Sequence, residues 1–370
     1  MPERVFGPAS SYGVLVTAGS IIKARIRQAS GSTQTLKHLR FGVAQLEPQG
    51  AGPVPLPEGV AAGWQMGDGS VFVGGNDQVI RKIDADGGTV WTTASLGATI
   101  NDLVTDPDGN VYALVGGNGE VHKYNTDGGE VWVHDDTLTS TDSTVARRLA
   151  VDVDRNVYVV HSPYISKLDS DGVQLWEHEH TETIRALAHA AEGFLYVGVA
   201  INSFILKFDT DGNEITDGFP AQGGTQHNPQ GMAAEPSDWF YVGNSSSSNN
   251  DSTHKFASNG VVAWSFDSGN ANAYGIAVDD DQNLYVSGND GTSPGVFKID
   301  AAGGEVWFAA TDGPPLCIAV DPDHNVFAGI GTSNRLYKFD SEGNELWQNN
   351  DPTGNVNGVG VVPGHFGSFG

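Results

Sequence analysis

The sequence predicts an all-β fold, a seven-bladed β-propeller of four-stranded antiparallel blades. Three observations predict it. A unit that runs from a lysine to a tryptophan recurs along the chain, with copies that begin at Lys82, Lys123, Lys167, Lys207, Lys255, Lys298 and Lys338. Successive copies begin 40 to 48 residues apart, a period typical of propeller blades. Short apolar runs alternate with turns rich in Asp and Gly, as expected for strands joined by tight hairpins.

Each unit divides into four strands. In the last copy, the apolar run 318–320 leads into an acidic turn at 321–325, and a second apolar run follows at 326–328. A variable loop, the lysine strand, a tight turn and the tryptophan strand complete the unit. The tryptophan stands nine residues after the lysine in six copies, and Thr216 takes its place after Lys207. We expect the tryptophan strand to be outermost, where a large ring packs against the neighbouring blade.

The chain ends predict how the ring closes. Residues 354–362 resemble the first strand of a unit, although residues 60–64 offer the first unit such a strand of its own. The C-terminal strand either joins the first blade or seeds an eighth blade with strands from residues 12–45. Both arrangements remove exposed sheet edges, and we expect seven blades.

Residues 1–56 lack the repeat, and a Gly/Pro-rich boundary at 49–57 separates them from a propeller at 57–370. Three short strands are expected in this segment, which is too small to form a stable hydrophobic core of its own. We therefore expect a β-rich docking and assembly arm. It would contact other structural proteins of a particle, or further copies of this chain in a homo-oligomer. Its basic docking residues are Lys23, Arg25, Arg27 and Arg40.

The net charge of −26 is unevenly distributed. Residues 1–60 hold six basic and three acidic side chains, so the acidity belongs to the repeats. Such a field repels nucleic acid and is tolerable at molar salt, which indicates a halophilic source.

No apolar run is long enough to insert into a membrane, and the N-terminus does not resemble a signal peptide. The single cysteine, Cys317, stands in an apolar run and is expected in the core.

The two faces of the predicted ring differ. Both tight turns of a unit emerge on one face, which the Asp residues make acidic. The opposite face is rich in Ser, Thr, Asn and Gly, and has adjoining insertions at 217–230 and 244–253. Because loops on a rigid scaffold usually carry recognition, we expect this loop-rich face, including Asn249 and Asn250, to bind the ligand.

The beginning of each innermost strand should line the mouth of the central channel. The candidate binding residues there are Arg147, Arg185, Asn228, Gln230, Tyr274 and Asn355. Amides, hydroxyls and two arginines suit sugar hydroxyls and an anionic group, whereas no ring of histidines or carboxylates is present. This composition argues against an enzyme. The two arginines either grip an anionic ligand or pair with nearby acids such as Asp142 and Glu182.

Two patterns raise the question of metal binding. The Asp-x-Asp-Gly turns, of which Asp209 and Asp211 form the nearest approach to a cation loop, either hold a structural calcium or similar cation or are simply tight turns. His178 and His180 alternate on one strand and are either a metal pair or solvent-facing. No other cofactor is expected.

The pattern Ile-Ala-Val-Asp-Pro-Asp-His-Asn-Val-Phe at 318–327, followed by Lys-Phe-Asp-Ser-Glu-Gly before Trp347, resembles the NHL-type and PQQ-like propeller repeats. The resemblance extends over residues 98–349. It implies architecture, because such propellers include interaction platforms, assembly factors, lyases, lactonases and quinoprotein dehydrogenases.

These observations predict a non-catalytic recognition and assembly module. We expect a virion surface or host-attachment protein of a virus of a halophilic microbe, extracellular without a signal peptide, whose loop-rich face binds a cell-surface glycan or glycoprotein. The alternatives are a propeller enzyme of the PQQ-like or lyase type, and a cytoplasmic protein-interaction scaffold.

Overall fold

A computed structural model describes residues 13–15, 25–27, 33–35, 69–116, 120–135, 147–190, 193–199, 204–216, 229–235, 239–244, 253–268 and 273–361. The chain divides into two units, Met1–Gly63 and Trp64–Gly370. In the first unit, strands β1 (Gly13–Leu15), β2 (Arg25–Arg27) and β3 (Thr33–Thr35) form one antiparallel sheet. The third strand expected there, at 39–44, lies outside the described residues.

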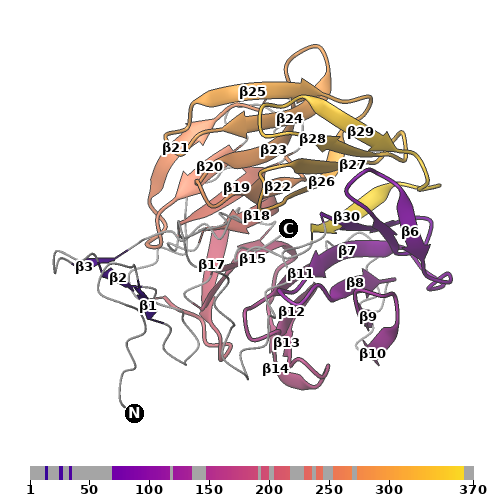
Figure 1. The fold of residues 1–370 in the computed structure, drawn as a ribbon. Coiled ribbons are helices and arrows are strands. Elements are labelled where there is room, and N and C mark those ends of the chain that lie inside the picture. The colour runs from indigo at the N-terminus through magenta and orange to yellow at the C-terminus, as the bar shows by residue number, and fades with distance from the viewer. Residues whose placement is uncertain are drawn as a thin grey trace. The chain divides into compact units, whose positions relative to one another are not determined.

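The second unit is a seven-bladed propeller (Figure 1), which confirms the predicted fold class. The innermost strand of each blade is buried around the axis. These strands are β30 (Val356–Val361), β7 (Ile100–Thr105), β11 (Arg147–Val151), β15 (Ile184–Ala190), β18 (Pro229–Ala234), β22 (Ile276–Val278) and β26 (Pro315–Val320). Each contacts the innermost strands of the blades before and after it, and the contact of β26 with β30 completes the cycle.

The second and third strands of every blade are almost entirely buried, and the second strands are also mostly apolar, whereas each third strand carries the repeat lysine. Neighbouring blades cover both faces of these strands, so neither face alternates with polar residues as a half-exposed strand would. The second strands are β4 (Val71–Gly75), β8 (Val111–Val115), β12 (Val157–His161), β16 (Phe194–Val199), β19 (Phe240–Asn244), β23 (Leu284–Asn289) and β27 (Val326–Ile330). The third strands are β5 (Arg81–Ile83), β9 (Glu120–Tyr124), β13 (Tyr164–Leu168), β17 (Phe204–Asp209), β20 (Thr253–Phe256), β24 (Pro294–Ile299) and β28 (Leu336–Phe339).

The tryptophan strands are outermost, as predicted. They are β6 (Thr89–Thr92), β10 (Glu130–His134), β14 (Gln174–Glu179), β21 (Val262–Phe266), β25 (Glu305–Ala310) and β29 (Glu345–Asn349). The fourth blade departs from the predicted four strands. Its described residues form the three-stranded sheet β15–β17 and a single bridge between Phe208 and Glu214. This is also the blade in which Thr216 replaces the tryptophan.

The C-terminal strand closes the ring by joining the first blade. β30 pairs antiparallel with β4, so the first blade has the order β30-β4-β5-β6. In Figure 1 the yellow β30 accordingly lies beside purple strands from the beginning of the propeller. The expectation of seven blades is confirmed, and residues 60–64 lie outside the described part of the chain.

In five of the seven blades, the lysine and the tryptophan both donate hydrogen bonds to the next blade. In the fourth blade Lys207 makes this contact. In the fifth blade Trp264 makes it, while Lys255 pairs with Glu235 of its own blade.

The lysine and the tryptophan of one blade are cross-strand partners, as Lys123 and Trp132 are in the second blade. The Lys123 Nζ and the Trp132 Nε1 both donate to the Ser170 carbonyl of the third blade, at 3.1 and 3.0 Å. The Trp132 ring also packs on Gly172, whose φ of 82° and close approach to the indole favour glycine. The lysine and the tryptophan, whose repetition predicts the fold, therefore also make contacts that join neighbouring blades.

Within the described residues, no helix is long and apolar enough to cross a membrane.

Candidate functional site

One residue from each blade occupies an equivalent place at the beginning of the innermost strand. These residues are Asn101, Arg147, Arg185, Gln230, Tyr274, Leu316 and Asn357, and we call them the mouth ring. In five blades the mouth-ring residue is the extra residue of a β-bulge, where the register of the first two strands shifts. A bulge turns a side chain out of the ladder. The mouth ring thus lies where the innermost strands begin, on the loop-rich face.

The two asparagines of the mouth ring hold neighbouring backbone. The Asn101 Nδ2 donates to the Gly116 carbonyl at 2.8 Å. The Asn357 Nδ2 donates to the Ile100 carbonyl of the next blade at 3.0 Å and to the Asn76 Oδ1 at 2.9 Å. These amides therefore help to fix the shape of the mouth.

Arg185 differs from the two asparagines. Its side chain is partly exposed, but its Nε is buried and has no hydrogen-bond partner among the residues that the structure describes. A buried guanidinium N–H without an acceptor is costly. The exposed part of the same side chain can form charge-assisted hydrogen bonds with an anionic ligand. Only the backbone of Arg147 is described, where it pairs with His161 in the adjacent strand.

A charged pair lies one residue further along the innermost strands. The equivalent position is small in five blades, at Ala186, Gly231, Gly275, Cys317 and Gly358, but it is Asp102 in the second blade and Arg148 in the third. The Arg148 Nη2 donates to the Gln230 carbonyl of the fifth blade at 3.0 Å, so this side chain passes the innermost strand of the fourth blade. It places a positive charge beside the backbone of the mouth-ring residue Gln230.

Asp102 is completely buried beside this charge. Its two carboxylate oxygens accept hydrogen bonds from the backbone N–H groups of Leu103 at 2.9 Å and Leu149 at 2.8 Å. Burial raises the pKa of Asp102 to about 6, although the nearby charge of Arg148 and these two N–H donors oppose the rise. Sequence reasoning missed this pair. The available signal was a charged residue at a strand position where other blades have Gly, Ala or Cys.

Four of the six predicted channel residues, Arg147, Arg185, Gln230 and Tyr274, belong to the mouth ring. Asn355 lies two residues before the ring, where its carbonyl accepts the Asn76 N–H at 3.0 Å. Asn228, Asn249 and Asn250 lie outside the described residues, as do Lys23 and Arg40 of the arm. Arg25 and Arg27 are described only as backbone of β2.

The Asp209 and Asp211 turn shows how the Asp-x-Asp-Gly turns use their carboxylates. The Asp209 Oδ1 accepts the backbone N–H groups of Asp211 and Asn213, and its Oδ2 accepts the Asn213 Nδ2 at 2.9 Å. The side-chain hydrogen bond from Asn213 is the largest cause of a lowered Asp209 pKa. These donors explain the Asp at this position as part of the turn, without a cation.

The predicted acidic face needs a correction, because a subset of its carboxylates is buried. The first Asp of the turn between the innermost and second strands is at most 8% exposed in four blades, at Asp106, Asp152, Asp279 and Asp321. The Asp106 carboxylate, for example, accepts the Asp108 and Asn110 backbone N–H groups and the Tyr112 hydroxyl. These residues fix the turn against the core, so the exposed carboxylates of this face are those of the other acids.

The interpretation of His178 and His180 as solvent-facing was wrong. Both imidazoles point, like Trp176, toward the neighbouring blade. The His178 ring packs edge-on against Phe208 with the centroids 5.0 Å apart, and His180 packs against Phe204 at 6.1 Å. The His180 Nδ1 also accepts the Glu182 backbone N–H at 3.1 Å. They fill the boundary between the third and fourth blades together with Trp176.

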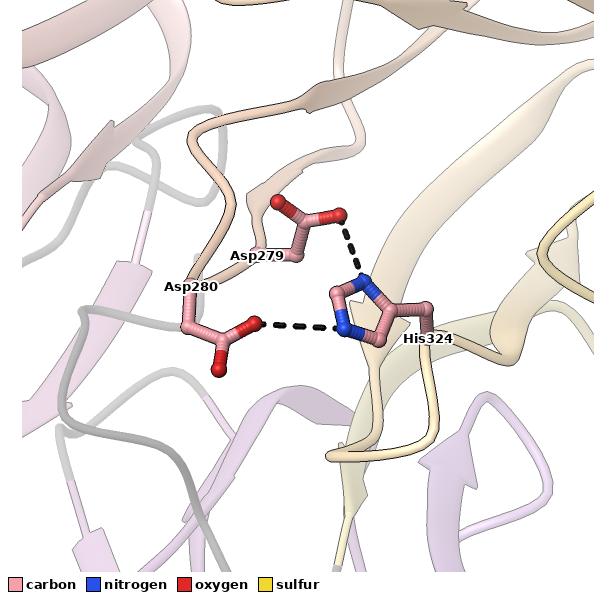
Figure 2. A group of neighbouring side chains, drawn as sticks. All are labelled: Asp279, Asp280 and His324. Atoms are coloured by element: carbon pink, nitrogen blue, oxygen red, sulfur yellow. Dashed lines mark hydrogen bonds and ion pairs between the residues drawn. The ribbon is translucent and has the colours of Figure 1, made fainter. Parts of the chain in front are cut away.

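A second cluster of ionisable groups lies on the acidic face, where the turns of the sixth and seventh blades meet (Figure 2). The His324 ring lies between two carboxylates, with its Nδ1 2.9 Å from the Asp279 Oδ2 and its Nε2 3.2 Å from the Asp280 Oδ1. Asp279, Asp280 and His324 form the group among the described residues that has metal-ligand geometry. Asp279 was part of the predicted acidic face, but His324 was missed, because no motif connects residues of different blades.

The fold and the channel mouth define a β-propeller of the PQQ-like repeat class. The chain belongs to the family described as outer membrane protein assembly factor BamB, whose sequence profile matches residues 25–213 and 252–363. No curated protein matches the chain in sequence.

Several solved structures share the fold. A catalytically inactive virginiamycin B lyase from Staphylococcus aureus with quinupristin is 13% identical, with a TM-score of 0.58 over 70% of this chain and 87% of that one. The Neurospora crassa Pan2 WD40 domain is 13% identical, with a TM-score of 0.52 over 72% and 79%. BamB from Moraxella catarrhalis is 18% identical, with a TM-score of 0.46 over 74% and 80%. At these identities the likeness to the lyase and to the Pan2 domain concerns the fold alone.

Proposed function

We propose that this protein is a non-catalytic recognition module whose channel mouth binds an anionic, hydroxyl-rich ligand such as an acidic glycan. The observation that carries the proposal is Arg185, which presents a buried Nε without a partner among the described residues at a partly exposed position of the mouth ring. The positive charge of Arg148 lies beside the Gln230 carbonyl of the same ring. Gln230 and Tyr274 add an amide and a hydroxyl at the same level.

The charge of the whole protein favours such a local site. The net charge of −26 repels anions at long range, so an anionic ligand gains affinity only where arginines are placed close to it. High salt screens the repulsion over about 3 Å at 1 M, while short contacts with a guanidinium persist. The binding should therefore tolerate salt better than binding to an open basic patch.

The test is calorimetric titration of the full-length protein with glucuronate and, as the neutral counterpart, glucose. We expect Arg185→Gln to weaken glucuronate binding at least tenfold. The matched control is Arg155→Gln, because Arg155 forms an exposed ion pair with Asp108 on the acidic face. Equal binding of both sugars, or equal loss in both variants, would contradict the proposal.

The proposal includes a place for the module on the surface of a particle, as the sequence predicts for a virion of a halophilic microbe. The acidic composition supports a high-salt setting, and residues 1–56 would provide the attachment to other particle proteins. Mass spectrometry of purified particles from an infected culture tests this placement. Finding the protein only in the particle-free cell fraction would contradict it.

Family membership favours a second function, a scaffold for protein assembly. The family description names an assembly factor, and a rigid propeller suits that role because its faces present loops to partners. Affinity purification of wild type and Arg185→Gln separates the two functions. A scaffold would retain its protein partners in the variant, whereas a glycan-recognition module would lose carbohydrate binding.

A further inference from the structure

We propose that the cluster at His324 is a binding site for a divalent transition-metal ion, with zinc as the representative, on the face opposite the mouth ring. The ligands are the His324 Nε2 and the carboxylates of Asp280 and Asp281. Asp279 orients the imidazole without being a ligand itself. The site is independent of the proposed recognition function.

The imidazole is held by a buried carboxylate. The Asp279 side chain is 1% exposed, and its Oδ2 lies 2.9 Å from the His324 Nδ1. Because a carboxylate oxygen accepts, Nδ1 carries the proton and donates it, which directs Nε2 toward the ligand position. A carboxylate that fixes the tautomer and orientation of a histidine is a recurrent feature of protein metal sites.

Asp279 is already fully engaged. Its Oδ1 accepts the Asn283 backbone N–H at 2.8 Å, and its Oδ2 accepts the Asn283 Nδ2 at 2.9 Å and the Tyr285 hydroxyl at 3.0 Å. A metal ion would have to displace these donors to reach it. The carboxylates that face Nε2 are instead Asp280 and Asp281, with side chains 40% and 56% exposed.

The distances around Nε2 suit a metal ion. The Asp280 Oδ1 lies at 3.2 Å and the Asp281 Oδ2 at 3.9 Å. Zinc bonds of about 2.0–2.2 Å at tetrahedral or octahedral angles place two ligand atoms roughly 3–3.5 Å apart. The first pair already has this separation, and a small rotation of the exposed Asp281 brings it within range. Water would complete the coordination.

The ligand types decide the class of ion. An imidazole nitrogen with two carboxylates suits zinc, nickel or cobalt, whereas calcium and magnesium prefer oxygen ligands alone. The backbone of His324 has a φ of 63°, in the left-handed region, and this conformation sets the direction of its side chain. The equivalent residue of the sixth blade is Gln282, with a φ of 67°, so glutamine is compatible with this turn.

The test is a zinc titration of the EDTA-treated full-length protein at pH 7.5, followed by calorimetry and thermal unfolding. We expect one saturable zinc site that raises the unfolding temperature. His324→Gln should lower the affinity of that site more than tenfold, and Asp280→Asn with Asp281→Asn should do the same. Asp279→Asn should weaken it by about 10- to 100-fold through the orientation of His324.

The control variant is again Arg155→Gln, which alters the equivalent turn of the third blade and should leave zinc binding unchanged. Cobalt absorption in the visible range gives a second readout, and its histidine-dependent band should vanish in His324→Gln. Unfolding temperatures without metal establish that each variant is folded. Undiminished zinc affinity in folded His324→Gln, or no saturable site in the wild type, would overturn the proposal. Calcium or magnesium competing equally with zinc would also do so.

Discussion

Lys338 and Trp347 donate to the same acceptor, the Ala85 carbonyl, at 3.3 and 2.8 Å. The two residues are cross-strand partners in the seventh blade, and Ala85 belongs to the first. Two sets of contacts therefore close the ring. One is the pairing of β30 with β4 near the axis, and the other is the pair of hydrogen bonds to the Ala85 carbonyl at the periphery.

Trp347→Phe tests how much the peripheral contact with Ala85 stabilises the closed ring. The variant loses the indole hydrogen bond and part of the contact with Gly87, although the phenyl ring keeps some packing. Because Trp347 is only half-buried, we expect a loss of about 1–2 kcal/mol in the free energy of unfolding, less than for emptying a fully buried site. Denaturant unfolding measures it, and an unchanged midpoint would contradict the role in closure.

Asp102 should make the stability depend on pH. Burial raises its pKa to about 6, above the unfolded value, so the folded state favours the protonated acid. Its contribution to stability is fully present below about pH 4 and is lost as the pH rises through 6. Asp102→Asn should flatten this part of the pH profile of the unfolding free energy. A variant profile parallel to the wild type would contradict the assignment.

His189 should act in the opposite direction. Burial lowers its pKa to about 4, and its ring stacks on Tyr158 with the centroids 5.2 Å apart. The folded state favours the neutral imidazole, so its contribution to stability is present above about pH 6.5 and is lost as the pH falls toward 4. His189→Val copies the residue at the equivalent position of the third blade, Val151. We expect the variant to resist acid better, as measured by the unfolding midpoint at pH 4.5 relative to pH 7.5.

Cys317 should be inert in the folded protein. It is 4% exposed, and burial is the largest cause of a raised thiol pKa. A thiol reagent at pH 8 should therefore label it only after unfolding. Rapid labelling of the native protein would place the residue at an accessible surface.

The repeat makes the fold predictable because it combines two signals. The Lys-to-Trp spacing identifies the outer hairpin of each blade, and the period of about 40 residues identifies the blades. The placement of one residue per blade at the channel mouth follows from the same period, so Arg185, Gln230 and Tyr274 could be grouped from sequence. The bulges that turn such residues toward the channel have no sequence signal of their own.

The tryptophan contacts between blades were predictable, but the contacts that single charged side chains make between blades were not. Arg148 of the third blade passes the innermost strand of the fourth blade and contacts Gln230 of the fifth. His324 contacts Asp279 and Asp280 of the preceding blade from a turn in which its own backbone is left-handed. The period places such residues in neighbouring or nearby blades, but the direction of each side chain depends on its local backbone. The same limit explains why His178 and His180 were expected in solvent. Alternation gives them one common side of the strand, and only the neighbouring blade shows that this side is covered.

The measurement that tests the central claim most directly is a crystal structure of the full-length protein soaked with glucuronate. We predict density for the sugar at the channel mouth, with its carboxylate within hydrogen-bond distance of the Arg185 guanidinium and its hydroxyls near Gln230 and Tyr274. Glucuronate bound elsewhere, or a mouth with no sugar at concentrations that saturate binding in solution, would contradict the account.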